Sequence, residues 1–192
     1  MRRVPQGGVG DSRYGHVSAG AGEHTEVMSQ DRAYGRVTNP ERFATLHDAV
    51  HELVASLRQR FDVLVVPMEP EGDDPCPKVL STVRVSPRND GASVTISLTS
   101  FPGLYVRFGA KHTERFPDCG CDACNEQIEE LAENLREKVL AVAAGRFSET
   151  DGGYAFVFEH GEQSGRQPRR RFRRESPTRH YEPWPLLGAD RY

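Results

Sequence analysis

The chain has 192 residues, 36% of them hydrophobic, which is enough for one domain with a modest core. It has no run of eighteen apolar residues, so we expect no membrane span, and its start lacks the apolar segment of a secretory signal. We therefore expect a soluble, cytoplasmic protein whose four cysteines stay reduced rather than forming a disulfide framework.

Charge is distributed unevenly along the chain. Residues 34–160 carry 13 Lys/Arg and 20 Asp/Glu, a net charge of −7, whereas residues 161–192 carry 8 and 4, a net charge of +4. An acidic body repels phosphate backbones, so we expect no nucleic-acid binding by residues 34–160. The Arg-rich run 168–174 leaves nucleic-acid binding through a C-terminal tail as an alternative.

Residues 1–33 are rich in glycine and serine and have no hydrophobic periodicity, so we expect a disordered N-terminal arm. A second hypothesis starts translation at Met28, a few residues before the first predicted helix, and makes residues 1–27 an upstream extension. In both hypotheses a single domain, residues 34–160, follows the arm, and residues 161–192 form a basic, Pro/Arg-rich tail.

Two segments have the periodicity of amphipathic helices, residues 38–61 and 125–145. Thr38 and Glu41 match a capping box at the start of the first, and Gly145 is suited to end the second. The apolar stripes consist of Phe43, Leu46, Val50, Leu53, Val54 and Leu57 in the first helix, and of Ile128, Leu131, Leu135, Val139 and Val142 in the second.

Between the helices, residues 61–67 are rich in β-branched side chains, and residues 78–86, 93–100 and 104–108 alternate apolar and polar side chains. Such alternation predicts an antiparallel sheet with one face exposed to water. The predicted fold is therefore α+β, with an antiparallel sheet of about four strands, two helices packed on one face and flexible tails. Residues 152–160 are a further candidate strand, and Tyr181, Trp184 and Leu186 are expected to dock on the body.

Cys119, Cys121 and Cys124 form a C-x-C-x-x-C cluster just before the second helix, with Gly120 allowing the backbone to turn. One interpretation is a tight turn in which the cysteines pack as small apolar side chains and Asp118 or Asp122 caps the helix. Another is a zinc site, because thiolates at this spacing can reach one tetrahedral ion. The fourth zinc ligand would then be Cys76, His112 or a water molecule.

A metal-free reactive thiol is the third interpretation, and the surroundings disfavour it. Asp118, Asp122 and Glu126 oppose the ionisation of nearby thiols, whereas a bound cation would reverse that balance. An enzyme would also need convergent polar groups, for which the sequence offers His112, Arg115 and Arg107. His47 and His51 form a separate H-x-x-x-H pattern, with Asp48 where zinc proteases have glutamate. Because aspartate is one methylene shorter and reaches less far towards a metal-bound water, the two are interpreted as ordinary helix-surface histidines.

At residues 34–50, 101–109 and 116–126 the chain resembles domain of unknown function 6226, a family of small actinobacterial proteins. The resemblance covers roughly residues 34–147, and the cysteine block with its preceding Phe-Pro is its most specific part. It implies a compact bacterial cytoplasmic domain and brings no activity, cofactor or catalytic residue with it.

The sequence thus predicts a non-enzymatic accessory or interaction protein with a protein partner, in which the cysteine turn is structural or binds zinc. The alternative is a metal- or thiol-dependent enzyme centred on Cys119, Cys121 and Cys124.

Overall fold

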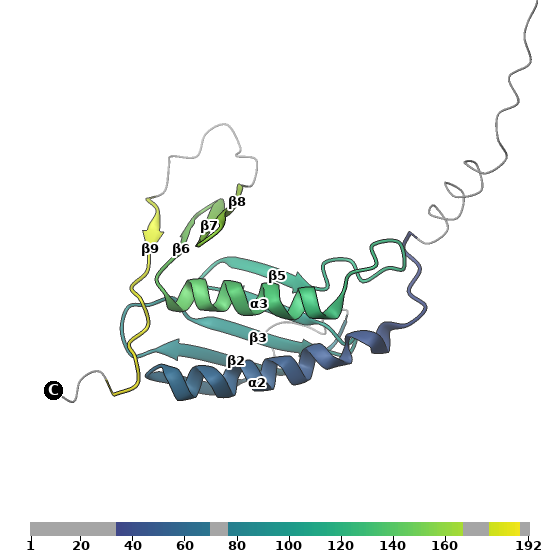
Figure 1. Ribbon diagram of the computed structural model, residues 1–192, viewed down its shortest axis with the longest axis horizontal. Helices are drawn as coiled ribbons and strands as arrows, with labels where there is room; N and C mark the ends of the chain where they lie inside the picture. Colours follow the sequence, from purple (N-terminus) through teal and green to yellow (C-terminus); the bar gives the residue numbers. More distant parts are fainter. Residues whose placement is uncertain (1–33, 70–76, 167–176, 189–192) are drawn as a thin grey trace, which may run out of the picture.

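The computed structural model describes residues 34–69, 77–166 and 177–188 of the chain (Figure 1). The predicted N-terminal arm, with the hypothesised start at Met28, and the Arg-rich run 168–174 lie outside these residues. Within the part of the chain that the structure describes, no helix is long and apolar enough to cross a membrane.

The larger of two sheets has five strands: β1 (Val63–Met68), β2 (Val79–Pro87), β3 (Val94–Thr99), β4 (Leu104–Phe108) and β5 (His112–Phe116). They form an antiparallel meander in the order β1-β2-β3-β4-β5. One face is apolar because side chains alternate along each strand, and Ile96, Val106 and Phe108 on that face are fully buried. The predicted alternation is confirmed for residues 93–100 and 104–108, whereas β2 departs from it at its start, where the register shifts between Val79 and Ser81.

Two helices cover this apolar face, as the sequence predicts (Figure 1). A short 3₁₀ helix, η1 (Pro40–Ala44), leads into α2 (Thr45–Arg60), and α3 (Ile128–Ala143) lies beside α2. Their stripes face the sheet, with Leu46, Val50 and Leu57 from α2 and Leu135, Val139 and Val142 from α3 all buried. At the end of α3, Gly145 has a φ of +70° and closes the helix, as predicted.

The second sheet differs from the prediction of one sheet with about four strands. It consists of β6 (Phe147–Thr150), β7 (Gly153–Phe158), β8 (Gly161–Arg166) and β9 (Arg179–His180), in the order β8-β7-β6-β9. Both β8 and β9 come from the segment predicted to be a flexible tail. The polar residues of β8 have no apolar pattern to mark a strand, and β8 is held by backbone pairing with β7 along its length.

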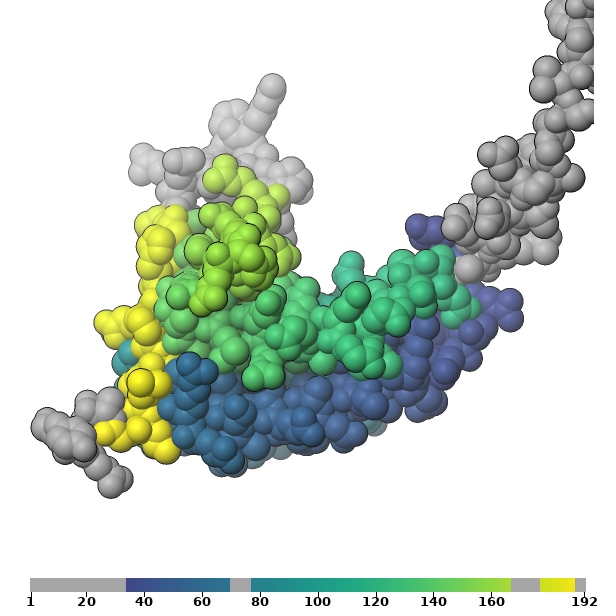
Figure 2. Space-filling view, in the orientation of Figure 1, coloured from purple at the N-terminus to yellow at the C-terminus, as the bar shows by residue number. Residues whose placement is uncertain are grey.

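Residues 177–188, which we call the C-terminal strap, lie across the ends of both helices (Figure 2). Backbone bonds join Trp184 N–H to Ala143 O (2.7 Å) and Asp62 N–H to Pro185 O (2.8 Å). The predicted docking is confirmed for Tyr181 and Trp184, which are buried, but not for Leu186, which is 55% exposed. The strap therefore completes the core at the end of the molecule away from the cysteines.

The predicted capping box at the first helix is wrong. The N-cap position before η1 is Asn39, and no side chain caps it. Both the backbone N–H and the hydroxyl of Thr38 donate instead to Asp122 Oδ1, at 3.0 and 3.1 Å. The Thr38 hydroxyl, which the capping-box pattern assigns to the helix start, thus bonds to Asp122, a residue distant in the sequence.

Candidate metal centre

The three cysteines lie on the connection between β5 and α3, and Gly120 allows this connection to fold tightly. Gly120 has a φ of +72°, and a Cβ placed there would lie 2.9 Å from Phe101 Cζ and 3.0 Å from Pro117 Cγ. The Phe101 ring in turn packs on Phe43, with ring centroids 5.9 Å apart. The cysteine turn therefore packs against the aromatic side chains at one end of the core. The glycine of the local sequence C-G-C is what permits this backbone conformation.

The carboxylate of Glu126 organises the turn from within. It accepts hydrogen bonds from the backbone N–H groups of Asp118 (2.9 Å), Cys119 (3.3 Å) and Gly120 (2.8 Å). The predicted cap by Asp118 or Asp122 is wrong, because α3 begins at Ile128 after an N-cap at Gln127 that has no side-chain bond. Glu126 thus accepts hydrogen bonds from the backbone N–H groups of the turn rather than from those of the helix. These bonds hold the backbone that carries the cysteines in place.

The turn is also tied to the beginning of the domain. The backbone N–H of Asp122 donates to Arg36 O at 2.8 Å, and the side chain of Asp122 receives both bonds from Thr38. These contacts join the segment before η1 to the segment before α3. The chain thus holds the cysteines at a junction that is braced from both sides.

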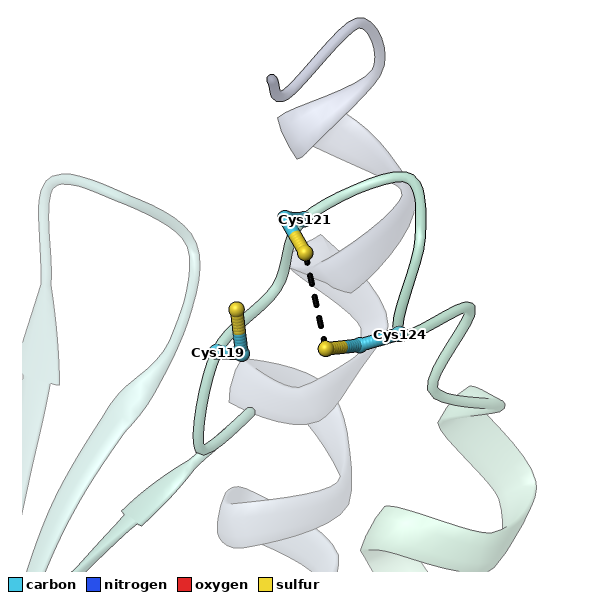
Figure 3. A group of neighbouring side chains, drawn as sticks. All are labelled: Cys119, Cys121 and Cys124. Atoms are coloured by element: carbon cyan, nitrogen blue, oxygen red, sulfur yellow. Dashed lines mark hydrogen bonds between the residues drawn. The ribbon is translucent and has the colours of Figure 1, made fainter. Parts of the chain in front are cut away.

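The three sulfur atoms lie within 4.8 Å of one another, with Cys121 Sγ and Cys124 Sγ 3.4 Å apart (Figure 3). Three sulfurs bound to one tetrahedral zinc at about 2.3 Å each are separated by about 3.8 Å. One observed spacing is shorter than that value and the others do not exceed 4.8 Å, so small side-chain rotations suffice to bring all three onto one ion. Cys121 is buried, while Cys119 and Cys124 are exposed, which leaves the outer side of the cluster open to a fourth ligand.

The pKa values of two of the thiols are shifted in opposite directions. A hydrogen bond from Cys119, together with bonds from the backbone N–H groups of Gly35 and Cys124, lowers the pKa of Cys121 from 9.0 to about 6. Hydrogen bonding to Cys121 and Cys119 raises the pKa of Cys124 to about 12. One thiolate is therefore stabilised by the others, and a divalent cation is the partner that would allow all three to ionise.

The other sequence candidates lie apart from this group. Among the described residues, the three cysteines are the group of His, Cys, Asp and Glu side chains that meets the geometry of a metal site. His112 on β5 has Nε2 2.7 Å from Glu114 Oε1, and its ring stacks on Tyr154 with centroids 3.5 Å apart. Cys76 lies outside the described residues, so its role as a fourth ligand stays a prediction.

The remaining candidates are also placed. His47 Nε2 lies 3.2 Å from Gly103 O, and His51 is exposed, in keeping with two ordinary helix histidines. Arg107 and Arg115 lie on the exposed face of the five-stranded sheet, where the Arg115 guanidinium sits 5.7 Å from the Tyr105 ring centroid. The structure thus assembles the thiols and leaves the polar groups expected of an enzyme elsewhere.

Comparison of the sequence with known protein families shows to which family the chain belongs. A family of unknown function, DUF6226, matches residues 13–186, which is most of the chain. The chain belongs to the DUF6226 family. No match was found among curated proteins or among solved structures. For this member of DUF6226, the functional argument therefore depends on the site itself.

Sequence reasoning missed a charged cluster in this DUF6226 domain, formed by His112, Glu114 and Lys138. Lys138 is only 4% exposed, and its ammonium donates to Glu114, which also bonds His112. A signal was present, because Lys138 falls three residues after Leu135 and four before Val142, on the buried stripe. A buried lysine at such a position requires a carboxylate partner from another element.

Proposed function

We propose that this domain is a cytoplasmic, non-enzymatic accessory or interaction protein whose cysteine turn holds a structural zinc ion. Cys119, Cys121 and Cys124 would be the ligands, and the ion would lock the junction between the start of the domain and α3. The observation that carries the proposal is the convergence of three sulfur atoms within 4.8 Å on a braced turn. The bacterial cytoplasmic setting, which keeps thiols reduced, rests on the family resemblance.

Two features support a zinc ion over simple packing of the cysteines. Exposed positions for Cys119 and Cys124 are unusual for cysteines that act only as small apolar side chains. Asp118, Asp122 and Glu126 are also close neighbours of the cysteines in the sequence, and positive charge would offset theirs. For the fourth ligand we propose Cys76 or a water molecule, because His112 is engaged by Glu114 and Tyr154.

Elemental analysis of the purified chain tests the proposal. Wild-type protein is expected to carry about one zinc per chain, and Cys121→Ser to carry none. Cys76→Ser separates the two fourth-ligand hypotheses, because it weakens zinc retention only when Cys76 is a ligand. Removing zinc with a chelator should lower the melting temperature, since binding energy contributes to folding at a structural site.

The control is Ser100→Ala, in the loop between β3 and β4, which leaves the cysteines intact and should retain zinc. Circular dichroism shows whether Cys121→Ser remains folded. Three results together would contradict the zinc site and support the packing interpretation. The wild-type protein would be folded, it would contain no metal after expression with added zinc, and zinc would not change its melting temperature.

One observation favours a second candidate, a thiol-dependent activity. The pKa of Cys121 is lowered to about 6, which favours its thiolate at neutral pH, and labelling shows whether a reagent reaches this buried side chain. Iodoacetamide labelling of metal-free protein distinguishes the two functions. Rapid alkylation of Cys121 near neutral pH supports a reactive thiol, whereas slow alkylation that zinc abolishes supports the structural site.

A further inference from the structure

The last two cysteines of the cluster lie at the two ends of one tight turn, residues 121–124, which we call the thiol turn. The backbone N–H of Cys124 donates to Cys121 O at 3.2 Å, and the N–H of Asn125 donates to the same oxygen at 3.4 Å. A four-residue turn of this kind keeps its end α-carbons within about 7 Å of each other. A disulfide bond joins residues whose α-carbons are about 4.4 to 6.8 Å apart. The backbone of the thiol turn is therefore folded close to the span that a disulfide needs.

The two side chains at the ends of the thiol turn point toward each other (Figure 3). Cys121 Sγ and Cys124 Sγ lie 3.4 Å apart, and a disulfide bond is about 2.05 Å long. The sulfurs must therefore approach by only about 1.4 Å, a shift within reach of side-chain rotation. The C-x-x-C spacing of these two residues is also that of reversible dithiol pairs, whereas a single residue separates Cys119 from Cys121.

The middle of the thiol turn is anchored to the start of the domain. The Asp122 N–H donates to Arg36 O at 2.8 Å, and the Asp122 carboxylate accepts both bonds from Thr38. These bonds do not involve the cysteine side chains, so they can persist while the sulfurs move. Two groups that are held together in this way react as if each were present at a high local concentration. The anchored turn thus favours a bond between its own two sulfurs.

A small oxidant can reach this pair from solvent. Cys124 is exposed, whereas Cys121 is buried. A solvent-accessible cysteine beside a second thiol is the arrangement found in redox-sensing pairs. The cytoplasmic setting proposed above keeps thiols reduced, so a disulfide in the thiol turn is expected to form on oxidation and to be reversed afterwards.

We infer that Cys121 and Cys124 form a reversible disulfide when the protein meets a peroxide. One sulfur is oxidised to a sulfenic acid as the peroxide O–O bond breaks and one water leaves. The other sulfur then attacks the sulfenic acid, which forms the S–S bond and releases a second water. The two thiols lose two hydrogen atoms in all, and the peroxide takes them up. A dithiol reverses the reaction by exchange and becomes a disulfide itself.

The disulfide also controls metal binding by the cluster, a consequence that rests on the proposed function. It withdraws two of the three sulfur ligands from the ion. Cys119 then supplies one bond, whereas a structural zinc site has four. Oxidation therefore releases the ion, and reduction allows it to bind again. Formation of the disulfide itself does not depend on a metal ion.

Mass spectrometry of the full-length chain after treatment with a small molar excess of hydrogen peroxide tests the inference. The protein is treated both as purified and after metal removal with a chelator, and free thiols are then blocked with iodoacetamide. Trypsin leaves the three cysteines of the cluster in one peptide, residues 116–136. This peptide is expected to lose two hydrogen atoms and to carry one alkyl group, on Cys119. Dithiothreitol added before iodoacetamide should allow all three cysteines to be alkylated.

Cys119→Ser and Cys124→Ser are a matched pair of variants, because each replaces an exposed cysteine of the cluster. Cys119→Ser should form the disulfide like the wild type, and Cys124→Ser should not form it. Free Cys121 and Cys124 after peroxide treatment would overturn the inference. A disulfide to Cys76 in place of the expected one, or the same behaviour in both variants, would overturn it as well.

Zinc release separates this inference from the proposed function. It is followed with a colorimetric zinc indicator while peroxide is added to the protein as purified. Release of about one zinc ion for each disulfide formed supports both proposals. A disulfide in a chain that never held zinc would contradict the structural zinc site and support the disulfide. Thiols that stay free in a chain that holds zinc, before and after chelation, would support the zinc site and overturn the disulfide.

Discussion

At the scale of single residues, the ionic cluster on β5 shows how the protein tolerates buried charge. Glu114 lies on the inner side of β5, between His112 on the same strand and Lys138 from α3. Burial raises the pKa of Glu114, but the hydrogen bonds from His112 and Lys138 outweigh it and hold the pKa below its ordinary value of 4.5. These partners thus keep the carboxylate ionised, and removing one of them would leave a buried charge uncompensated.

This lowered pKa predicts a specific acid dependence of stability. A carboxyl whose folded pKa lies below its unfolded value of 4.5 contributes stability above that pH and loses it as the pH falls through the folded pKa. Glu114→Gln should therefore unfold with a shallower loss of stability below pH 4.5 than the wild type. Urea unfolding at several pH values between about 3 and 6 measures the difference.

Two variants keep this prediction specific. Glu137→Gln, on the exposed side of α3, should leave the acid dependence close to that of the wild type. Lys138→Met leaves Glu114 without its ammonium partner and should cost about 2 kcal/mol at neutral pH, less than for a fully buried pair because water reaches part of the carboxylate. Parallel stability curves for Glu114→Gln and wild type would contradict the role given to Glu114.

At the scale of elements, two glycines determine where segments end. Gly145 closes α3: its N–H donates to Val142 O at 3.0 Å, and the next N–H, of Arg146, donates to Ala141 O at 2.8 Å. Gly120 turns the chain between the first two cysteines, at a position where a Cβ would meet Phe101 and Pro117. The first end is readable from the helical pattern, whereas the second owes its importance to contacts with distant aromatic residues.

Gly120→Ala should therefore destabilise the fold and disturb the cysteine cluster together. Left-handed backbone costs a non-glycine residue roughly 1–2 kcal/mol, and the new methyl group would also press on Phe101. Gly152→Ala is the control, because a Cβ there meets nothing within 4 Å. Urea unfolding of both variants, with zinc content measured in parallel, checks the effect; equal stability of the two would contradict it.

How much of this fold could be predicted depends on whether each element carries its own apolar pattern. Both helices and the strands around Ile96 and Val106 do so, and they were predicted correctly. The strand β5 does not, because Glu114 occupies an inward position and is stabilised there by His112 and by Lys138 from α3. Likewise, the C-x-C-x-x-C spacing indicates that the sulfurs can meet, but the bonds from Glu126 that order the turn depend on tertiary geometry.

At the scale of the whole molecule, Glu149 joins three parts of the structure. This residue of β6 is only 2% exposed, and its carboxylate accepts N–H bonds from Ala110 at 2.8 Å and Lys111 at 2.9 Å, between β4 and β5. The Tyr181 hydroxyl of the C-terminal strap donates to the same carboxylate. One side chain thus connects the large sheet, the small sheet and the strap, which predicts that the three unfold together.

Trp184 makes this cooperativity measurable, because it is the single tryptophan of the chain and lies on the strap, with its indole N–H bonded to Ala92 O at 2.9 Å. In urea, Trp184 fluorescence and far-UV circular dichroism should follow one transition. Glu149→Gln should lower the unfolding free energy by about 2 kcal/mol, since bonds to a buried charge are lost, while the two probes remain coincident. Exposed Glu159→Gln should change neither. Fluorescence that changes at lower urea than circular dichroism in the wild type would mean that the strap unfolds on its own, and that Glu149 does not join it to the sheets.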